Sequence, residues 1–373
     1  MKCKLKDFCT VINGRAYNQK ELLDKGKYRV LRVGNFFSSD RWYFSDLELP
    51  AEKYCNKGDL LFAWACSFGP RIWNGEDRTI FHYHIWKLDI DSNIVDKMYL
   101  FYLLKISVDS MTAGTHGSVM MHITKSDMEN FEFDIPTLEV QKKIAAILSA
   151  LDEKIAINRA INDNLQQQAA ALFSSLYDRS NTEVGFTDLI QILGGGTPKT
   201  GENTYWNGNI AFFTPKDVGT PYTLITEKTI SKEGLSHCNS RLYPVNTVFV
   251  TARGTVGKVG MSGVPMAMNQ SCYALVGKET HQLLVYFYTL KAVDRLKHKA
   301  SGAVFDAITT RDFESEQIMK LSDDDATAFL RVAEPMFQEV LNNNIENLRL
   351  STLRDSLLPK LMSGEIDVSA VQL

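Results

Sequence analysis

The feature that most constrains this chain is a stretch of about forty residues, 137–179, that contains neither glycine nor proline. Such a stretch predicts one long helix, because no residue in it interrupts the backbone hydrogen-bond ladder. Thr137 is a suitable N-cap, and Glu139 places an acidic group in the first turn. At ~1.5 Å per residue the helix would be a rod on the order of 60 Å long.

One side of this helix repeats at alternating steps of three and four residues, which is typical of a coiled-coil seam. Its members are Ile144, Leu148, Leu151, Ile155, Asn158, Asn162, Leu165, Ala169, Leu172 and Leu176. A shift of 185 residues carries Asn158 to Asn343 and Asn162 to Asn347, within a second helical segment from about Asp323 to Met362. Pro335 lies inside that segment, so we expect the helix to begin or kink there.

The shared asparagines indicate that the two helices pair with each other as an antiparallel coiled coil. Polar residues in an apolar seam cost stability, and their best-attested benefit is that facing pairs fix register and orientation. The predicted helix-pairing residues are Asn158, Asn162, Leu165, Asn343, Asn347 and Leu350.

The remainder of the chain predicts two mixed α/β domains, so the fold class is α+β with an internal pseudo-two-fold repeat. Short aromatic and β-branched runs at residues 28–33, 59–64, 82–88, 248–251 and 271–276 predict strands. Motifs recur in order in the two domains, for example Ile123-Thr124-x-x-Asp127 and Ile308-Thr309-x-x-Asp312. The predicted boundaries are 1–135 for the first domain, 136–182 for the long helix, 183–322 for the second domain and 323–373 for the C-terminal helix.

Composition indicates the compartment of the protein and the kind of partner that it binds. The six cysteines form no CxxC pair, which favours a reducing cytoplasm over a zinc site or a disulfide framework. No apolar run approaches the ~20 residues that a membrane helix needs. The net charge of -3 is low for a protein whose sole partner is nucleic acid, so a DNA-binding surface would be local or shared with a partner.

No catalytic motif is complete, and we expect the chain not to be an enzyme. Residues 254–258 (GTVGK) do not satisfy the phosphate-binding pattern G-x-x-x-x-G-K-[ST]. Asp152-Glu153-Lys154 resembles a nuclease motif but is predicted to lie on a solvated helix face. His82, His84, His116 and His122 match no metal-ligand spacing, so no metal site is expected.

Both domains carry basic, amide and aromatic side chains in loops between strands. Arg and Lys suit guanine edges and phosphates, and Asn and Gln suit adenine. The candidate DNA-binding residues are Arg15, Tyr17, Arg32, Asn35, Arg41, Trp42, Ser67, Arg71, Trp73, His82, His116, Thr197, Lys199, Lys216, Arg253, Thr255, Lys258, Asn269 and Gln270.

Residues 136–148 (PTLEVQKKIAAIL), continuing through 151–155 (LDEKI) to Asn158 and Asn162, resemble the central conserved region of type I restriction-modification specificity subunits. Residues 353–364 (LRDSLLPKLMSG) resemble the distal conserved region of that family, and 58–64 (GDLLFAW) and 253–258 (RGTVGK) are similar to strings in its recognition domains. The resemblance covers essentially the whole chain.

This resemblance implies that each domain reads one half of an asymmetric bipartite DNA site. It further implies two methyltransferase subunits bound to the conserved helices, with motor and nuclease subunits added for cleavage. S-adenosylmethionine, ATP and Mg would be bound by these partners and not by this chain. If the helices set the gap between half-sites, it should be roughly 5 to 8 base pairs at ~3.4 Å per step. The alternative is a coiled-coil DNA-binding or protein adaptor outside restriction-modification.

Overall fold

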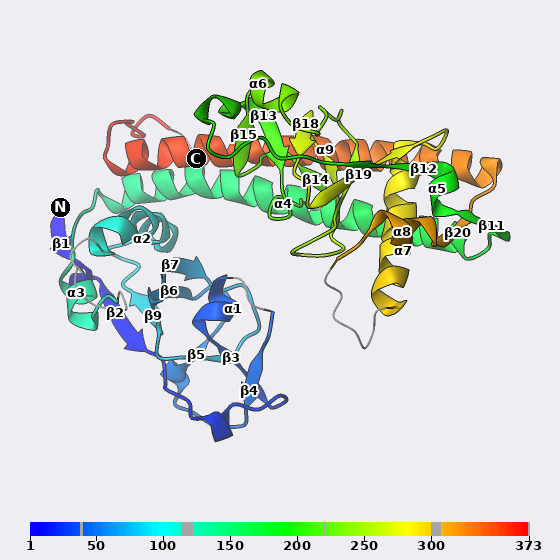
Figure 1. The fold of residues 1–373 in the computed structure, drawn as a ribbon. Coiled ribbons are helices and arrows are strands. Elements are labelled where there is room, and N and C mark those ends of the chain that lie inside the picture. Colours follow the sequence, from blue (N-terminus) through cyan, green and yellow to red (C-terminus); the bar gives the residue numbers. More distant parts are fainter. Residues whose placement is uncertain (38–39, 113–121, 220, 300–306, 372–373) are drawn as a thin grey trace. The chain divides into compact units, whose positions relative to one another are not determined.

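The structure is a computed structural model that describes residues 1–37, 40–112, 122–219, 221–299 and 307–371 (Figure 1). The chain divides into two compact units. The first unit contains Met1–Glu153 and Leu350–Leu373, and the second contains Lys154–Arg349. The two longest helices contribute residues to both units.

In the first unit, two four-stranded sheets enclose a small core. The order of the first sheet is β2-β9-β6-β7 and that of the second is β4-β3-β8-β5. The strands are β2 (Cys9–Asn13), β3 (Tyr28–Leu31), β4 (Tyr43–Ser45), β5 (Tyr54–Cys55), β6 (Leu60–Ala65), β7 (Ser67–Ile72), β8 (Thr79–Phe81) and β9 (Ile85–Ile90). Strand alternation sends Leu61 and Ala63 of β6 into the core between the sheets, and Leu60 and Phe62 to the opposite face.

That opposite face packs with helix α2 (Lys97–Thr112) in a second apolar cluster, which also takes in the start of the long helix α4. Helices α1 (Val33–Phe37) and α3 (Lys125–Asn130) are short. Strand β1 (Lys2–Lys4) pairs antiparallel with β10 (Glu132–Asp134), so the beginning and end of the first domain are joined.

The second unit repeats this plan with different residues. Its sheets have the orders β12-β19-β16-β17-β14 and β15-β13-β18. The strands are β12 (Ile190–Gly194), β13 (Trp206–Phe213), β14 (Tyr222–Thr223), β15 (Lys228–Ile230), β16 (Val248–Thr251), β17 (Val259–Ser262), β18 (Met266–Met268) and β19 (Cys272–Gly277). Strand β11 (Thr182–Gly185) pairs with β20 (Gln317–Lys320) as β1 does with β10.

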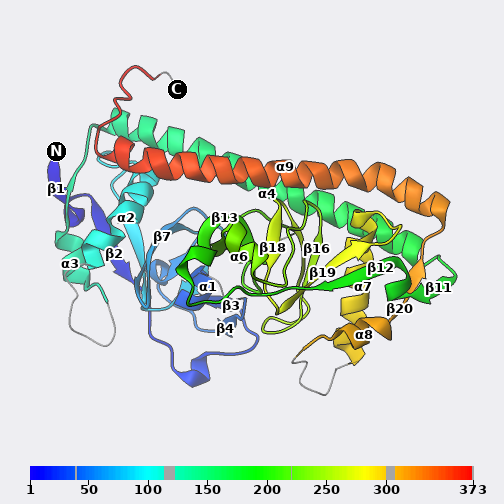
Figure 2. The same cartoon turned by 45° about the horizontal axis from the view of Figure 1, so that its top comes forward.

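Helix α7 (Gln282–Lys299) lies beside β19 in this unit and corresponds to α2 of the first (Figure 2). The short helices are α5 (Phe186–Leu189), α6 (Lys232–Ser236) and α8 (Thr310–Glu314). Both α3 and α8 begin with a capping box, in which Thr124 and Asp127, or Thr309 and Asp312, bond to each other's backbone. The predicted motif repeat is therefore a repeat of helix starts.

The long helices are α4 (Leu138–Tyr177) and α9 (Asp323–Met362), and they lie side by side in both views (Figures 1 and 2). The two helices are antiparallel, because residues later in α4 contact residues earlier in α9. In the second unit Asn158 donates to Asn347 at 3.0 Å, and Asn343 donates to Asn162 at 2.9 Å. In the first unit Arg354 reaches back to Asp152. The α+β class and the antiparallel helix pair predicted from the sequence are confirmed.

Two sequence expectations about the helices need correction. Of the two alternatives at Pro335, a helix start is excluded, because α9 begins at Asp323 and runs through the proline. Ala333 and Phe337 beside it are buried, so packing offsets the lost hydrogen bond. Asp152 is not on a freely solvated face, because it accepts from Tyr102 at 2.7 Å and pairs with Arg354.

Within the described residues, none of the helices combines the length and apolar character required to cross a membrane. The six cysteines are all free thiols.

Candidate nucleic-acid interface

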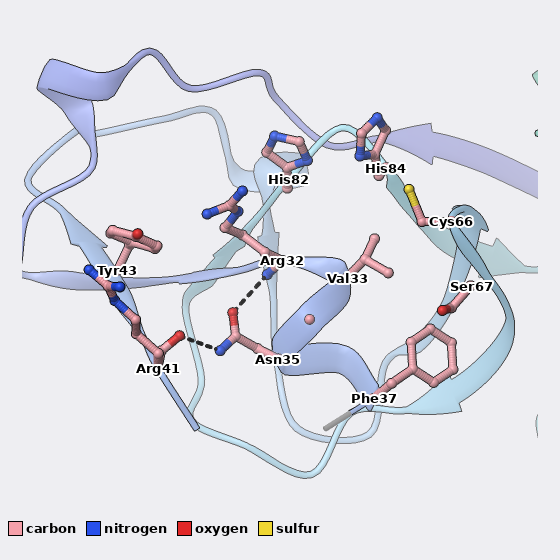
Figure 3. Close-up of a pocket in the computed structure, with 11 residues that line it drawn as sticks. Arg32, Val33, Asn35, Phe37, Arg41, Tyr43, Cys66, Ser67, His82 and His84 are labelled. Carbon is pink, nitrogen blue, oxygen red and sulfur yellow. Dashed lines mark hydrogen bonds between the residues drawn. The ribbon is translucent and has the colours of Figure 1, made fainter. Parts of the chain in front are cut away.

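The first domain has an open hollow of about 600 Å³ at one end of its two sheets. It forms where β3 passes into α1, where the β6–β7 hairpin turns, and where β8 leads into β9 (Figure 3). The side chains that line it are mainly cationic, aromatic and imidazole groups: Arg32, Val33, Asn35, Phe37, Arg41, Tyr43, Cys66, Ser67, His82 and His84. Five of the predicted DNA-binding residues meet here, namely Arg32, Asn35, Arg41, Ser67 and His82.

The side chain of Asn35 connects two sides of this hollow. Its Oδ1 accepts from the backbone N–H of Arg32 at 3.4 Å, and its Nδ2 donates to the carbonyl of Arg41 at 2.8 Å (Figure 3). The bonds tie the start of α1 to the segment that leads into β4. Asn35 therefore positions both arginines as well as lining the hollow.

The cationic groups of the hollow are arranged around one aromatic ring. The guanidinium carbon of Arg32 lies 5.3 Å from the centre of the Tyr43 ring, and that of Arg41 lies 5.4 Å from it. Contacts of this kind hold a guanidinium in place without neutralising its charge. The hollow therefore presents positive charge and N–H donors, which suit phosphates and the acceptor edges of bases.

Two histidines form the opposite side of the hollow (Figure 3). Burial, together with the nearby His84 and Arg32, lowers the pKa of His82 to about 4. Burial also lowers the pKa of His84, with Arg32 as the second cause. Both rings are therefore neutral near pH 7, and each offers one donor and one acceptor nitrogen.

Other first-domain candidates have partners inside the protein. Arg15 pairs with Glu21 at 2.7 Å, and Arg71 donates to the backbone carbonyl of Phe36. Trp73 is buried in the core and donates to the carbonyl of Glu76, so its side chain is not exposed for contact with DNA. Tyr17 and Trp42 are half-buried. His116 lies outside the described residues.

Second-domain candidates gather around the β16–β17 turn and the segments that face it. Arg253, Thr255 and Lys258 are exposed at this turn, and Thr255 donates to the carbonyl of Pro215 at 3.2 Å. Lys216 pairs with Glu227 at 3.5 Å. Thr197 donates to the side chain of Gln270. Asn269 is half-buried and Lys199 is exposed.

The two domains hold these groups on the same backbone arrangement, which we call the shared frame. Three backbone hydrogen bonds of the first domain have counterparts of nearly equal length in the second. The bond from His82 N to Leu31 O corresponds to that from Asn269 N to Phe213 O, both 2.9 Å, and the bond from Arg15 N to Phe81 O to that from Gly196 N to Met268 O, both 3.1 Å. The bond from Trp64 N to His84 O, 3.1 Å, corresponds to that from Ala252 N to Ser271 O, 2.8 Å. Gly14 and Gly195 also correspond. A Cβ on Gly14 would lie 2.3 Å from the carbonyl oxygen of His82, and a Cβ on Gly195 would lie 2.1 Å from that of Asn269.

The shared frame identifies residues that sequence reasoning missed. His84 and Cys66 line the hollow but were not among the predicted contacts. His84 could have been found, because it lies two residues from His82 in the same short connection between β8 and β9. Cys66 has a positive φ of 68°, and its counterpart Gly254 has a positive φ of 81°. A cysteine in the sequence gives no signal of this backbone conformation.

The four predicted helix-pairing asparagines lie where the two long helices meet. Asn158, Asn162 and Asn343 are buried, and Asn162 also donates to Asn344 at 3.0 Å. Glu346 adds a contact that was not predicted, since it accepts from Asn158 at 2.6 Å and pairs with Lys154 at 3.3 Å. Among the described residues, no three His, Cys, Asp or Glu side chains gather closely enough to hold a metal ion.

Comparison with known proteins places this architecture in a family. The family model of the type I restriction modification DNA specificity domain matches residues 1–167 and again residues 181–320. The type I restriction enzyme HindI specificity subunit of Haemophilus influenzae is 25% identical, over 86% of this chain and 89% of its own length. The EcoR124I/EcoR124II specificity subunit of Escherichia coli is 27% identical, over 53% of this chain and 52% of its own length.

A solved structure shares the fold. It is the S subunit of a type I restriction-modification system from M. genitalium, with a TM-score of 0.63 and 16% sequence identity. The similarity covers 97% of this chain and 95% of that one.

Two similar domains on a paired helix scaffold, with a cationic hollow in the first domain, fit the class of proteins that recognise DNA. This chain belongs to the type I restriction-modification DNA specificity family, whose model matches most of its length. It is a non-catalytic specificity subunit, and its curated relatives carry the name specificity subunit.

Proposed function

We propose that the chain directs a type I restriction-modification complex to an asymmetric, bipartite DNA site, with each domain reading one half. The observation that carries this proposal is the shared frame, which holds different side chains in the two domains. At corresponding places the first domain has Arg32 and His82, and the second has Thr214 and Asn269. Because the two domains hold different side chains on the same backbone frame, we expect the two half-sites to differ in sequence.

Partners of this complex supply the catalysis in our proposal. Two methyltransferase subunits bind the conserved helices and methylate adenine, and motor and nuclease subunits cleave unmodified DNA. S-adenosylmethionine, ATP and Mg are bound by these partners, and the complex works in the cytoplasm, where its DNA is. A docking role for α4 is supported by two exposed apolar side chains one turn apart, Ile157 at 55% and Ile161 at 41% exposure.

A genome-wide map of methylated adenine tests this function. Host cells with and without the gene are compared in a strain where the neighbouring methyltransferase is expressed and active. We expect one two-part motif with a fixed gap to lose methylation when the gene is deleted. An unchanged map in that strain would contradict the proposal.

A further inference from the structure

The shared frame makes it possible to compare the two domains position by position. Three positions in or directly beside this frame face the hollow of the first domain, and we call them the reading positions. They carry Arg32, His82 and His84 in the first domain and Thr214, Asn269 and Ser271 in the second. The two later positions make frame bonds through backbone atoms, which do not depend on the side chain, and Arg32 and Thr214 directly follow the frame residues Leu31 and Phe213.

Arg32 differs in its surroundings from three other arginines of the first domain. Arg15, Arg29 and Arg78 pair with Glu21, Glu76 and Glu48, at 2.7, 3.1 and 3.6 Å. Within the described part of the chain, no carboxylate lies within ion-pair distance of Arg32, which is half-buried at the floor of the hollow. Its charge is therefore available to a ligand.

The geometry around Arg32 suits a flat ligand edge rich in acceptors. The Tyr43 ring holds the guanidinium in place, and the start of α1 is tied to Arg41 through Asn35. A planar guanidinium in a fixed orientation donates two parallel hydrogen bonds. In the major groove, guanine presents two neighbouring acceptors, O6 and N7, that match this fork.

We propose that Arg32 is a specificity-determining residue that reads a guanine in the half-site of the first domain. The inference rests on the proposed function and deepens it by naming a base. Thr214 holds the corresponding position in the second domain and has no such fork, so the other half-site does not depend on an arginine here. His82 and His84 supply hydrogen-bonding groups beside the same base pair.

The test uses the full chain in complex with its methyltransferase and the substitution Arg32→Thr, which installs the second-domain residue. Adenine methylation is mapped in cells, and the purified complex is titrated with duplexes in which each base pair of the motif is replaced in turn. We expect the requirement for guanine to relax at one position of one half-site. Discrimination there should fall on the order of 10- to 100-fold, with the other half-site unchanged.

Two matched variants keep the result interpretable. Arg29→Thr makes the same change three residues earlier, on strand β3, at an arginine paired with Glu76, and should leave the motif unchanged. Arg32→Lys keeps the charge and is the mildest change, so it retains the fold and should still relax the guanine position because it lacks the fork.

Each outcome decides a different question. Uniformly weaker binding to all duplexes, with full discrimination kept in both Arg32 variants, would show a phosphate contact and overturn the inference. A bipartite motif in the wild type that contains no guanine sensitive to Arg32 would also overturn it, while leaving the proposed function intact. Absence of any motif that depends on the wild-type chain would reject the proposed function itself.

Discussion

At the scale of single residues, burial acts on His82 more strongly than neighbouring charge does. Burial is the largest cause and His84 and Arg32 act in the same direction, and together they lower the pKa of the imidazole to about 4. The Tyr17 ring stacks at 6.3 Å and carries no charge that would oppose this. The unfolded chain binds a proton at this histidine near pH 6.5, whereas the folded chain binds it near pH 4.

This difference predicts how stability depends on pH. Between pH 6.5 and 4 the unfolded state holds the extra proton, so the free energy of unfolding falls as the pH falls. We expect His82→Asn, which installs the residue found at Asn269, to lose less stability than the wild type between pH 7.5 and 5. Urea unfolding at the two pH values measures this. Equal losses in the wild type and in His82→Asn would contradict the prediction.

Sequence alone could identify a site residue by its type and loop position, but it could not show which backbone group the residue bonds to. Arg32, Asn35, Arg41, Ser67 and His82 were named because residue type and loop position are visible in the sequence. Trp73 was named for the same reasons, but the structure buries it. Its partner, the carbonyl of Glu76, is a backbone group that every residue has, so sequence carries no sign of it. The shared frame likewise consists of long-range backbone bonds.

At the scale of elements, the long helices could be predicted almost completely. Their apolar periodicity extends over many turns, and a long regular pattern is the most reliable signal in a single sequence. The exception is Pro335, where local propensity indicated a start or a kink, whereas α9 begins at Asp323 and continues through the proline. The sheets were harder to predict, because pairings such as β3 with β8 join segments about fifty residues apart.

The asparagines of the helix pair give a testable coupling. Asn162→Leu leaves the buried amide of Asn343 without its acceptor and should lower the free energy of unfolding by about 1–3 kcal/mol. The double variant Asn162→Leu with Asn343→Leu removes both groups and should recover most of the loss. Urea unfolding measures both.

A control for this pair lies next to Asn343. Asn342→Leu changes an exposed residue of α9 and should alter stability by no more than about 0.5 kcal/mol. If the double variant is as unstable as the sum of two single losses, the asparagines do not act as a pair.

At the scale of the whole molecule, charge limits what the chain can do with DNA by itself. The net charge is -3, so the cations of the hollow act against an overall negative protein. Affinity for DNA falls with salt according to the number of phosphates neutralised, with a slope of about -0.9 per contact. In the proposed complex, the methyltransferases supply much of the positive surface.

Salt dependence therefore distinguishes the chain from its complex. We expect the slope of log K against log salt to be shallow for the purified chain and steeper by several units once methyltransferase is bound. Fluorescence anisotropy with a labelled duplex measures both slopes. Lys258→Gln, an exposed cation of the second domain, should reduce the slope of the complex by about one. Equal slopes for chain and complex would mean that the chain supplies the phosphate contacts.

The shared frame also bears on how such a protein acquires new targets. Because backbone bonds hold the reading positions, replacing a side chain there removes few interactions on which folding depends. New preferences can therefore arise by single substitutions that selection for a stable fold does not oppose. The glycines that abut the frame, Gly14 and Gly195, have the opposite character, since any added side chain would meet backbone. The molecule thus separates positions free to vary from positions that must stay fixed, a few ångströms apart.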